Sequence, residues 1–112
     1  MGELSVAGGA SEARGANEAT SRVAHRLHVT GRVQGVGFRW FACELARRFD
    51  VAGWTRNLAD GSVQIEAEAE GGAMDRFVAA LREGPPSAQV ASVIVEPRAQ
   101  ADPLPTPFQI RR

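Results

Sequence analysis

Residues 31–39, which read Gly-Arg-Val-Gln-Gly-Val-Gly-Phe-Arg, constrain the fold of this chain more than any other stretch. Before and into this segment, apolar residues alternate with polar ones, which is typical of a half-buried strand. From Phe38 onward, apolar residues recur at helical spacing and form one stripe. Gly35 and Gly37 allow the chain to turn tightly between the two patterns. The segment therefore predicts a strand, a tight glycine turn and a helix that begins directly after the turn.

The same segment has the chemistry of an anion site. Consecutive N–H groups in a glycine turn can surround an anion, and the start of a helix adds free N–H groups and the positive end of its dipole. Arg39 falls in the first helical turn, where its planar guanidinium can donate paired hydrogen bonds to phosphate oxygens. Taken alone, however, the pattern also fits a tight turn followed by a solvated arginine.

The rest of the chain continues the alternation of strands and helices. Extended patterns cover about residues 51–58, 63–69, 89–96 and 108–110, and a second helical stripe covers 74–81 before the stop at Gly84-Pro85-Pro86. The order β-α-β-β-α-β with a short fifth strand predicts the α+β class. We expect a ferredoxin-like two-layer sandwich, in which a mostly antiparallel sheet carries both helices on one face.

Glutamates alternate with apolar residues along the third predicted strand. Glu66, Glu68 and Glu70 share one face, and Val63, Ile65, Ala67 and Ala69 share the other. A row of carboxylates can serve acid–base catalysis, but the alternation is typical of a strand with one solvated face. We therefore expect all three glutamates to lie in water.

Residues 1–22 differ in composition from the rest of the chain. They are rich in Ala, Gly, Ser and Glu and show no periodic apolar pattern, so they cannot bury enough surface to offset the entropy of ordering. We predict a disordered N-terminal tail over 1–22, with a partner-binding arm as the alternative, and one folded domain over 23–112.

Composition excludes several classes of function. The chain has 13 basic and 13 acidic residues, so no broad field attracts nucleic acid or an anionic membrane. No apolar run approaches the ~20 residues that span a bilayer, and no secretory signal is present. Cys43 is the single cysteine, and His25 and His28 point to opposite faces of a strand. We expect a cytoplasmic protein with no disulfide, no metal site and a packed Cys43.

A second motif, Gly53-Trp54-Thr55-Arg56-Asn57, follows at the end of the second predicted strand. An asparagine there is a common turn former, but its amide also donates and accepts hydrogen bonds and can hold a water in place. A guanidinium and a ring of N–H groups can hold a phosphate. Phosphoryl transfer depends mainly on such positioning and charge stabilisation.

Together the two motifs resemble the signatures of the acylphosphatases. Residues 31–39 resemble the first signature, and residues 53–57 followed by Gly61-Ser62-Val63 resemble the second, in the correct order and spacing. The resemblance covers the chain from about residue 24. Thr55 stands where the family usually has a small apolar residue, and Ala69 stands where it usually has glycine, both on the strand scaffold.

The resemblance implies hydrolysis of the carboxyl-phosphate bond of a small-molecule acyl phosphate, without metal or cofactor. By position, Arg39 would bind the phosphate and Asn57 would orient the attacking water. The N–H groups of the phosphate-binding loop would complete the site, and inorganic phosphate or sulfate would bind there as product-like ligands. The loop comprises Gln34, Gly35, Val36, Gly37 and Phe38. We expect the enzyme to be a monomer.

Three other functions remain open at this stage. A non-catalytic module could use the same site to bind a phosphorylated metabolite. An RNA-binding domain shares the order of elements, although a glutamate-rich sheet face would repel a phosphate backbone. An acylphosphatase-like domain also occurs in larger carbamoyl-transfer maturation proteins, but no further domain pattern follows here, so we expect a free-standing enzyme.

Overall fold

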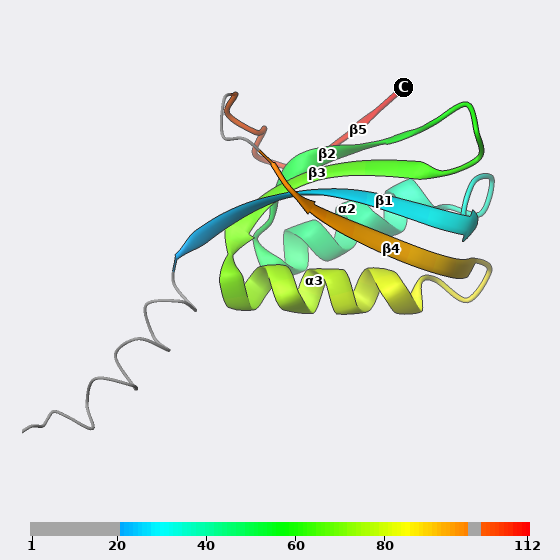
Figure 1. The fold of residues 1–112 in the computed structure, drawn as a ribbon, viewed down its shortest axis with the longest axis horizontal. Coiled ribbons are helices and arrows are strands. Elements are labelled where there is room, and N and C mark those ends of the chain that lie inside the picture. Colours follow the sequence, from blue (N-terminus) through cyan, green and yellow to red (C-terminus); the bar gives the residue numbers. More distant parts are fainter. Residues whose placement is uncertain (1–20, 99–101) are drawn as a thin grey trace, which may run out of the picture.

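The computed structural model describes residues 21–98 and 102–112, so residues 1–20 of the predicted tail lie outside the described residues. The described chain forms five strands and two helices in the predicted order (Figure 1). They are β1 (Arg22–Arg32), α2 (Phe38–Phe49), β2 (Ala52–Asn57), β3 (Val63–Glu70), α3 (Gly71–Glu83), β4 (Gln89–Pro97) and β5 (Gln109–Arg111). Strand β1 begins at Arg22, the last residue assigned to the predicted tail.

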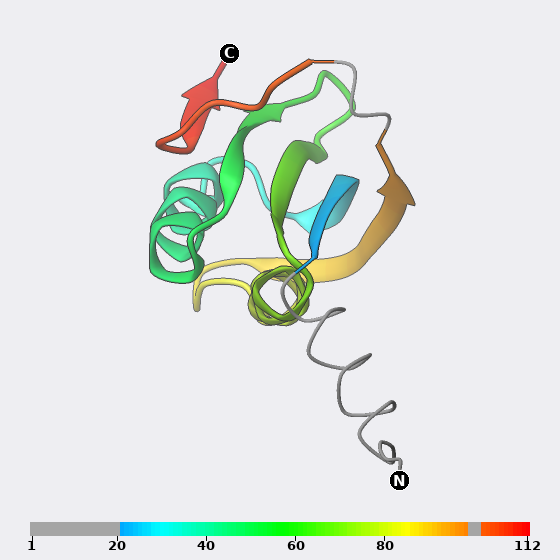
Figure 2. The same ribbon diagram turned by 90° about the vertical axis from the view of Figure 1, so that its left-hand side faces the viewer.

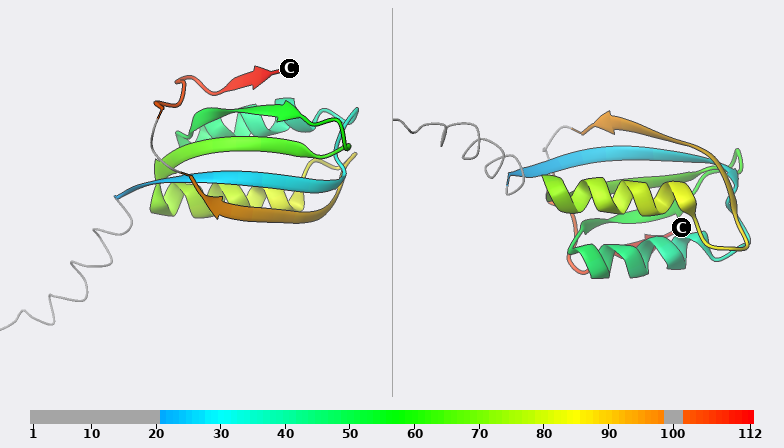
Figure 3. Two further views of the ribbon diagram at one scale, coloured as in Figure 1. Left: turned by 45° about the horizontal axis from the view of Figure 1, so that its top comes forward. Right: turned by 90° about the horizontal axis from the view of Figure 1, so that it is seen from below.

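The strands form one sheet in the order β4-β1-β3-β2-β5. Strand β1 pairs antiparallel with β3 and with β4, and β3 also pairs antiparallel with β2. Strand β5 pairs parallel with β2. Both helices pack on the same face of this sheet (Figures 2 and 3). The predicted ferredoxin-like two-layer sandwich is therefore confirmed.

The core lies between the helices and the sheet. Helix α2 buries Phe38, Ala42, Cys43, Leu45 and Ala46, and α3 buries Met74, Phe77 and Leu81. These side chains meet the inward residues of β1 and β3 in one cluster, and each large one contributes about 1.5–3 kcal/mol by leaving water. Cys43 is a small packed residue as predicted, with its thiol donating to the Phe108 carbonyl at 3.6 Å.

The prediction that the β3 glutamates are solvated is wrong for Glu66. This side chain is 2% exposed, and its carboxylate accepts hydrogen bonds from the Nε atoms of Arg26 and Arg98, both at 2.6 Å. Gln64 donates a third hydrogen bond at 2.9 Å. Burial alone raises the pKa of the Glu66 carboxyl, but these hydrogen bonds outweigh it and lower the pKa. The long arginines cover the strand, which alternation in sequence cannot reveal.

The topology brings three strand ends together. Because β1 and β2 both run antiparallel to β3, they point in the same direction, and β5 runs parallel to β2. The C-terminal ends of all three strands therefore lie at one end of the sheet, where the chain turns from β1 into α2 (Figure 1). In the described part of the chain, no helix is long and apolar enough to cross a membrane.

Candidate active site

The turn between β1 and α2 depends on glycines. Gly35 and Gly37 have φ angles of 75° and 77°, in the left-handed region where other residues pay about 1–2 kcal/mol. No side chain of the described residues caps α2, and the first helical hydrogen bond runs from the Phe41 N–H to the Gly37 carbonyl at 3.0 Å. The N–H groups of residues 38–40 therefore have no acceptor within the helix, and they carry its positive dipole end.

Side-chain contacts hold this turn in place. The Gln34 amide donates to the carbonyls of Leu58 and Ser62 at 2.7 and 2.8 Å, which ties the turn to the β2–β3 hairpin. The Ser87 hydroxyl donates to the Val36 carbonyl at 3.0 Å. The sequence predicted a role only for the backbone N–H of Gln34. The side-chain contacts of Gln34 and Ser87 join residues far apart in the chain, so no local pattern encodes them.

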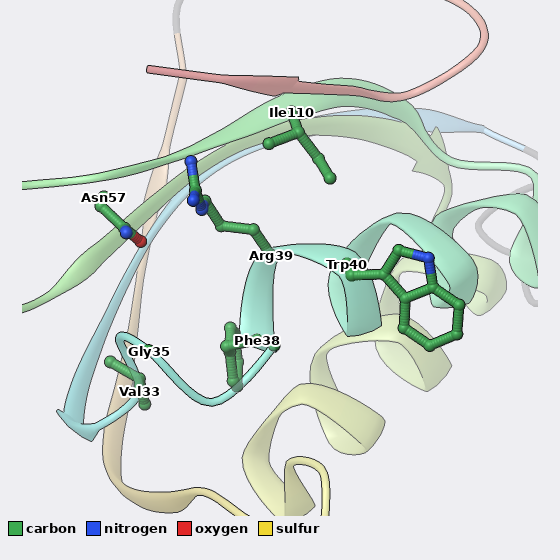
Figure 4. Close-up of a pocket in the computed structure, with 8 residues that line it drawn as sticks. Val33, Gly35, Phe38, Arg39, Trp40, Asn57 and Ile110 are labelled. Atoms are coloured by element: carbon green, nitrogen blue, oxygen red, sulfur yellow. The ribbon is translucent and has the colours of Figure 1, made fainter.

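Arg39 lies in the first turn of α2 and is half-buried. Its Nη1 donates to the backbone carbonyl of Arg111, at the end of β5, at 3.2 Å. This contact leaves the rest of the guanidinium fork available to a ligand and directs the side chain toward the end of β2 (Figure 4). The contribution of β5 was not predicted, because the contact joins residues 72 positions apart.

Asn57 is the last residue of β2. Its Oδ1 atom is buried and has no hydrogen-bond partner among the described residues. A buried acceptor without a partner costs about 1–3 kcal/mol, and a water bound beside it would remove that cost. The side chain of Asn57 points into the space between the glycine turn and Arg39 (Figure 4).

Arg39, Asn57 and the glycine turn line one pocket of about 200 Å³. A water occupies roughly 30 Å³ in the liquid, so the pocket can hold a small polyatomic anion together with a water. Of the predicted loop, Gly35, Gly37 and Phe38 line this pocket, whereas Gln34 and Val36 are not among its lining residues. The full lining comprises Val33, Gly35, Gly37, Phe38, Arg39, Trp40, Asn57 and Ile110.

A second polar cluster joins β1 to the β2–β3 hairpin and does not form a catalytic triad. The Nε2 atom of His28 lies 2.7 Å from the Ser62 hydroxyl. In a triad the carboxylate contacts the other ring nitrogen, but here Asp60 is 4.0 Å from the same Nε2. The hydroxyl and the N–H of Ser62 both donate to Asp60 Oδ1 and so close the hairpin, and these hydrogen bonds lower the pKa of Asp60.

The departures from the family pattern lie in the scaffold. Thr55 and Ala69 are fully buried in β2 and β3, and neither lines the pocket. Across residues 21–98 and 102–112, no group of three or more His, Cys, Asp or Glu side chains is arranged to hold a metal ion. The positive charge in the pocket comes from Arg39 and the α2 N-terminus, an arrangement suited to a phosphate.

Comparison with known proteins identifies close relatives. The family model described as Acylphosphatase matches residues 25–110. An acylphosphatase from Salinibacter ruber is 49% identical over 84 residues, which are 75% of this chain and 87% of the relative. The solved acylphosphatase from Coxiella burnetii matches with a TM-score of 0.74 and 32% identity over 80% of this chain and 93% of that chain. The Bacillus subtilis acylphosphatase matches with a TM-score of 0.69 and 37% identity, over 80% and 99%.

Proposed function

The chain belongs to the acylphosphatase family and hydrolyses acyl phosphates, and from that premise we propose that Arg39, Asn57 and the α2 N-terminus divide the work of the reaction. Water adds to phosphorus, the bond from phosphorus to the carboxyl oxygen breaks, and the products are a carboxylate, inorganic phosphate and a proton. The observation that carries the proposal is the Oδ1 of Asn57, which has no hydrogen-bond partner in residues 21–98 and 102–112 and lies in the same pocket as Arg39.

The phosphate sits on the glycine turn in this mechanism. The free N–H groups at the start of α2 and the N–H groups of residues 34–38 donate to its oxygens. Arg39 adds a permanent charge and a paired grip. Because charge spreads over these oxygens in the transition state, donors already held in place stabilise it without reorganisation.

Asn57 acts on the attacking water. Its free Oδ1 accepts a hydrogen bond from the water and directs a lone pair of the water oxygen toward phosphorus. The leaving group is a carboxylate, which needs no proton to depart. A positioned water and a bound phosphate are therefore sufficient, and the mechanism needs neither a metal nor a cofactor.

Turnover of benzoyl phosphate by the purified protein in EDTA tests the proposal. We expect hydrolysis that inorganic phosphate or sulfate inhibits by competing with the substrate. The kcat/KM should fall at least about 100-fold in Arg39→Ala. Arg47→Ala is the matched control, because Arg47 lies exposed on the same helix and pairs with Glu44 instead. Phosphate binding without turnover would instead support the non-catalytic metabolite-binding module.

The setting of the enzyme belongs to the same proposal. We propose a monomer that acts in the cytoplasm on a small-molecule acyl phosphate, with no nucleic-acid or membrane partner. Size-exclusion chromatography with light scattering checks the oligomeric state, and a mass of 11.9 kDa is the expected result.

A further inference from the structure

The pocket has an apolar side that the proposed chemistry does not use. Ile110 in β5 is 45% exposed and Trp40 in α2 is 65% exposed, and both line the pocket. Large hydrophobic side chains are scarce on the surface of the described residues, where Ile94 and Val95 are the others. Two of these four therefore gather at the phosphate site, which indicates a surface for an apolar group.

The geometry places this surface where the acyl group departs. The attacking and leaving oxygens of a phosphoryl transfer lie roughly in line on opposite sides of phosphorus. In the close-up, Asn57 lies on one side of the Arg39 guanidinium, and Ile110 and Trp40 lie on the other (Figure 4). With the phosphate beside this guanidinium, as in the proposed function, a water held by Asn57 directs the leaving carboxylate, with its acyl body, toward Ile110 and Trp40.

The charge of the pocket points the same way. Among the described residues that line it, Arg39 is the sole charged one, and the mechanism uses Arg39 for the phosphate that is transferred. A second anionic group on the acyl body would meet no further cation among the described residues that line the pocket. An uncharged, apolar body would instead leave water by covering Ile110 and Trp40.

We infer that this enzyme prefers acyl phosphates with an uncharged, apolar acyl body such as an aromatic ring, and that Ile110 and Trp40 set this preference. The inference rests on the proposed function, because it assumes that the phosphate lies against Arg39 and the glycine turn. It assigns the specificity to two side chains that take no part in the chemical step.

The test is the ratio of kcat/KM for benzoyl phosphate to that for acetyl phosphate. We expect the ratio to exceed one in the unaltered protein and to fall about three- to tenfold in Ile110→Ala and in Trp40→Ala. This fall is smaller than the discrimination that one methylene group gives in an enclosed pocket, because Ile110 and Trp40 are both partly exposed to water. The inhibition constant of inorganic phosphate, which lacks an acyl body, should not change. Ile94→Ala is the matched control, since Ile94 is 47% exposed and lies outside this pocket.

The outcomes separate this inference from the proposed function. Active variants whose ratio equals that of the unaltered protein would overturn the inference alone, as would an equal fall in Ile94→Ala. A phosphate inhibition constant that rises in the variants whose ratio falls would also overturn it, because the effect would then arise at the phosphate. If the unaltered protein hydrolyses neither compound, the proposed function itself fails.

Discussion

At the residue scale, a buried carboxylate and a buried amide oxygen show how structure and function use hydrogen bonds differently. Both oxygens of the Glu66 carboxylate are bonded, to Arg26, Gln64 and Arg98. The Oδ1 of Asn57, in contrast, has no partner among the residues that the structure describes and lies at the edge of the pocket. A fold can easily satisfy a buried amide, so an amide oxygen kept open at the edge of this pocket is suited to accept a hydrogen bond from a water.

Replacing Arg39 with lysine tests whether its shape matters or only its charge. We expect Arg39→Lys to remain as impaired as Arg39→Ala, at least about 100-fold in kcat/KM, because an ammonium cannot reproduce the planar fork. Lysine also loses the geometry of the contact with the Arg111 carbonyl. Steady-state kinetics with benzoyl phosphate measures the effect, and near-normal turnover in the lysine variant would show that a point charge is enough.

At the element scale, the site exists because the C-terminal ends of β1, β2 and β5 lie at the same end of the sheet. Arg39 and Asn57 could be predicted from sequence because each lies in a local motif, and the topology then brings the two motifs together. The role of β5 could not be predicted, because a three-residue strand carries little pattern of its own. The burial of Glu66 was missed because arginines from two other segments cover it.

The bonded Glu66 makes the sheet sensitive to acid. Its folded-state pKa is lowered below the ordinary value of 4.5. Its contribution to stability is therefore complete above that ordinary value and is lost as the pH falls through the lowered pKa. In Glu66→Gln we expect the free energy of unfolding at pH 7 to drop by about 2–3 kcal/mol. This is less than the loss of about 3–5 kcal/mol that is usual when a buried ion pair is broken, because Arg26 is half exposed.

The Glu66→Gln variant should also lose part of the fall in unfolding free energy that the unaltered protein shows at acid pH. Urea denaturation at a series of pH values between 7 and 2 measures both effects. Glu68→Gln is the matched control, because Glu68 lies on the same strand face and pairs with the exposed Arg22, so it should change stability by less than about 1 kcal/mol. Equal acid profiles for the Glu66→Gln variant and the unaltered protein would contradict the assigned role of Glu66.

At the scale of the whole molecule, Ser21, the first described residue, and the site lie at opposite ends of β1. Strand β1 has 11 residues and so is about 35 Å long at roughly 3.3 Å per residue. Residues before it join the domain at its first residue, and the glycine turn follows its last. Ser21 is the first described residue, and its carbonyl accepts a hydrogen bond from the Gly71 N–H at 2.9 Å.

Deletion of residues 2–20 tests the predicted division of the chain. Because this segment lacks a core-forming pattern, we expect the melting temperature and kcat/KM to stay within error of the full chain. Ser21 is kept because of its hydrogen bond with Gly71. A clear fall in either quantity would show that the segment docks on the domain.

The most direct test of the account measures kcat and the phosphate inhibition constant together in Asn57→Ala. If Asn57 orients the water and does not hold the phosphate, kcat falls by about 10²–10³, roughly 3–4 kcal/mol of transition-state stabilisation. The inhibition constant for phosphate stays within about twofold, and circular dichroism is unchanged. Near-normal kcat, or a large rise in the inhibition constant that accounts for the loss of activity, would contradict the division of labour between Asn57 and Arg39.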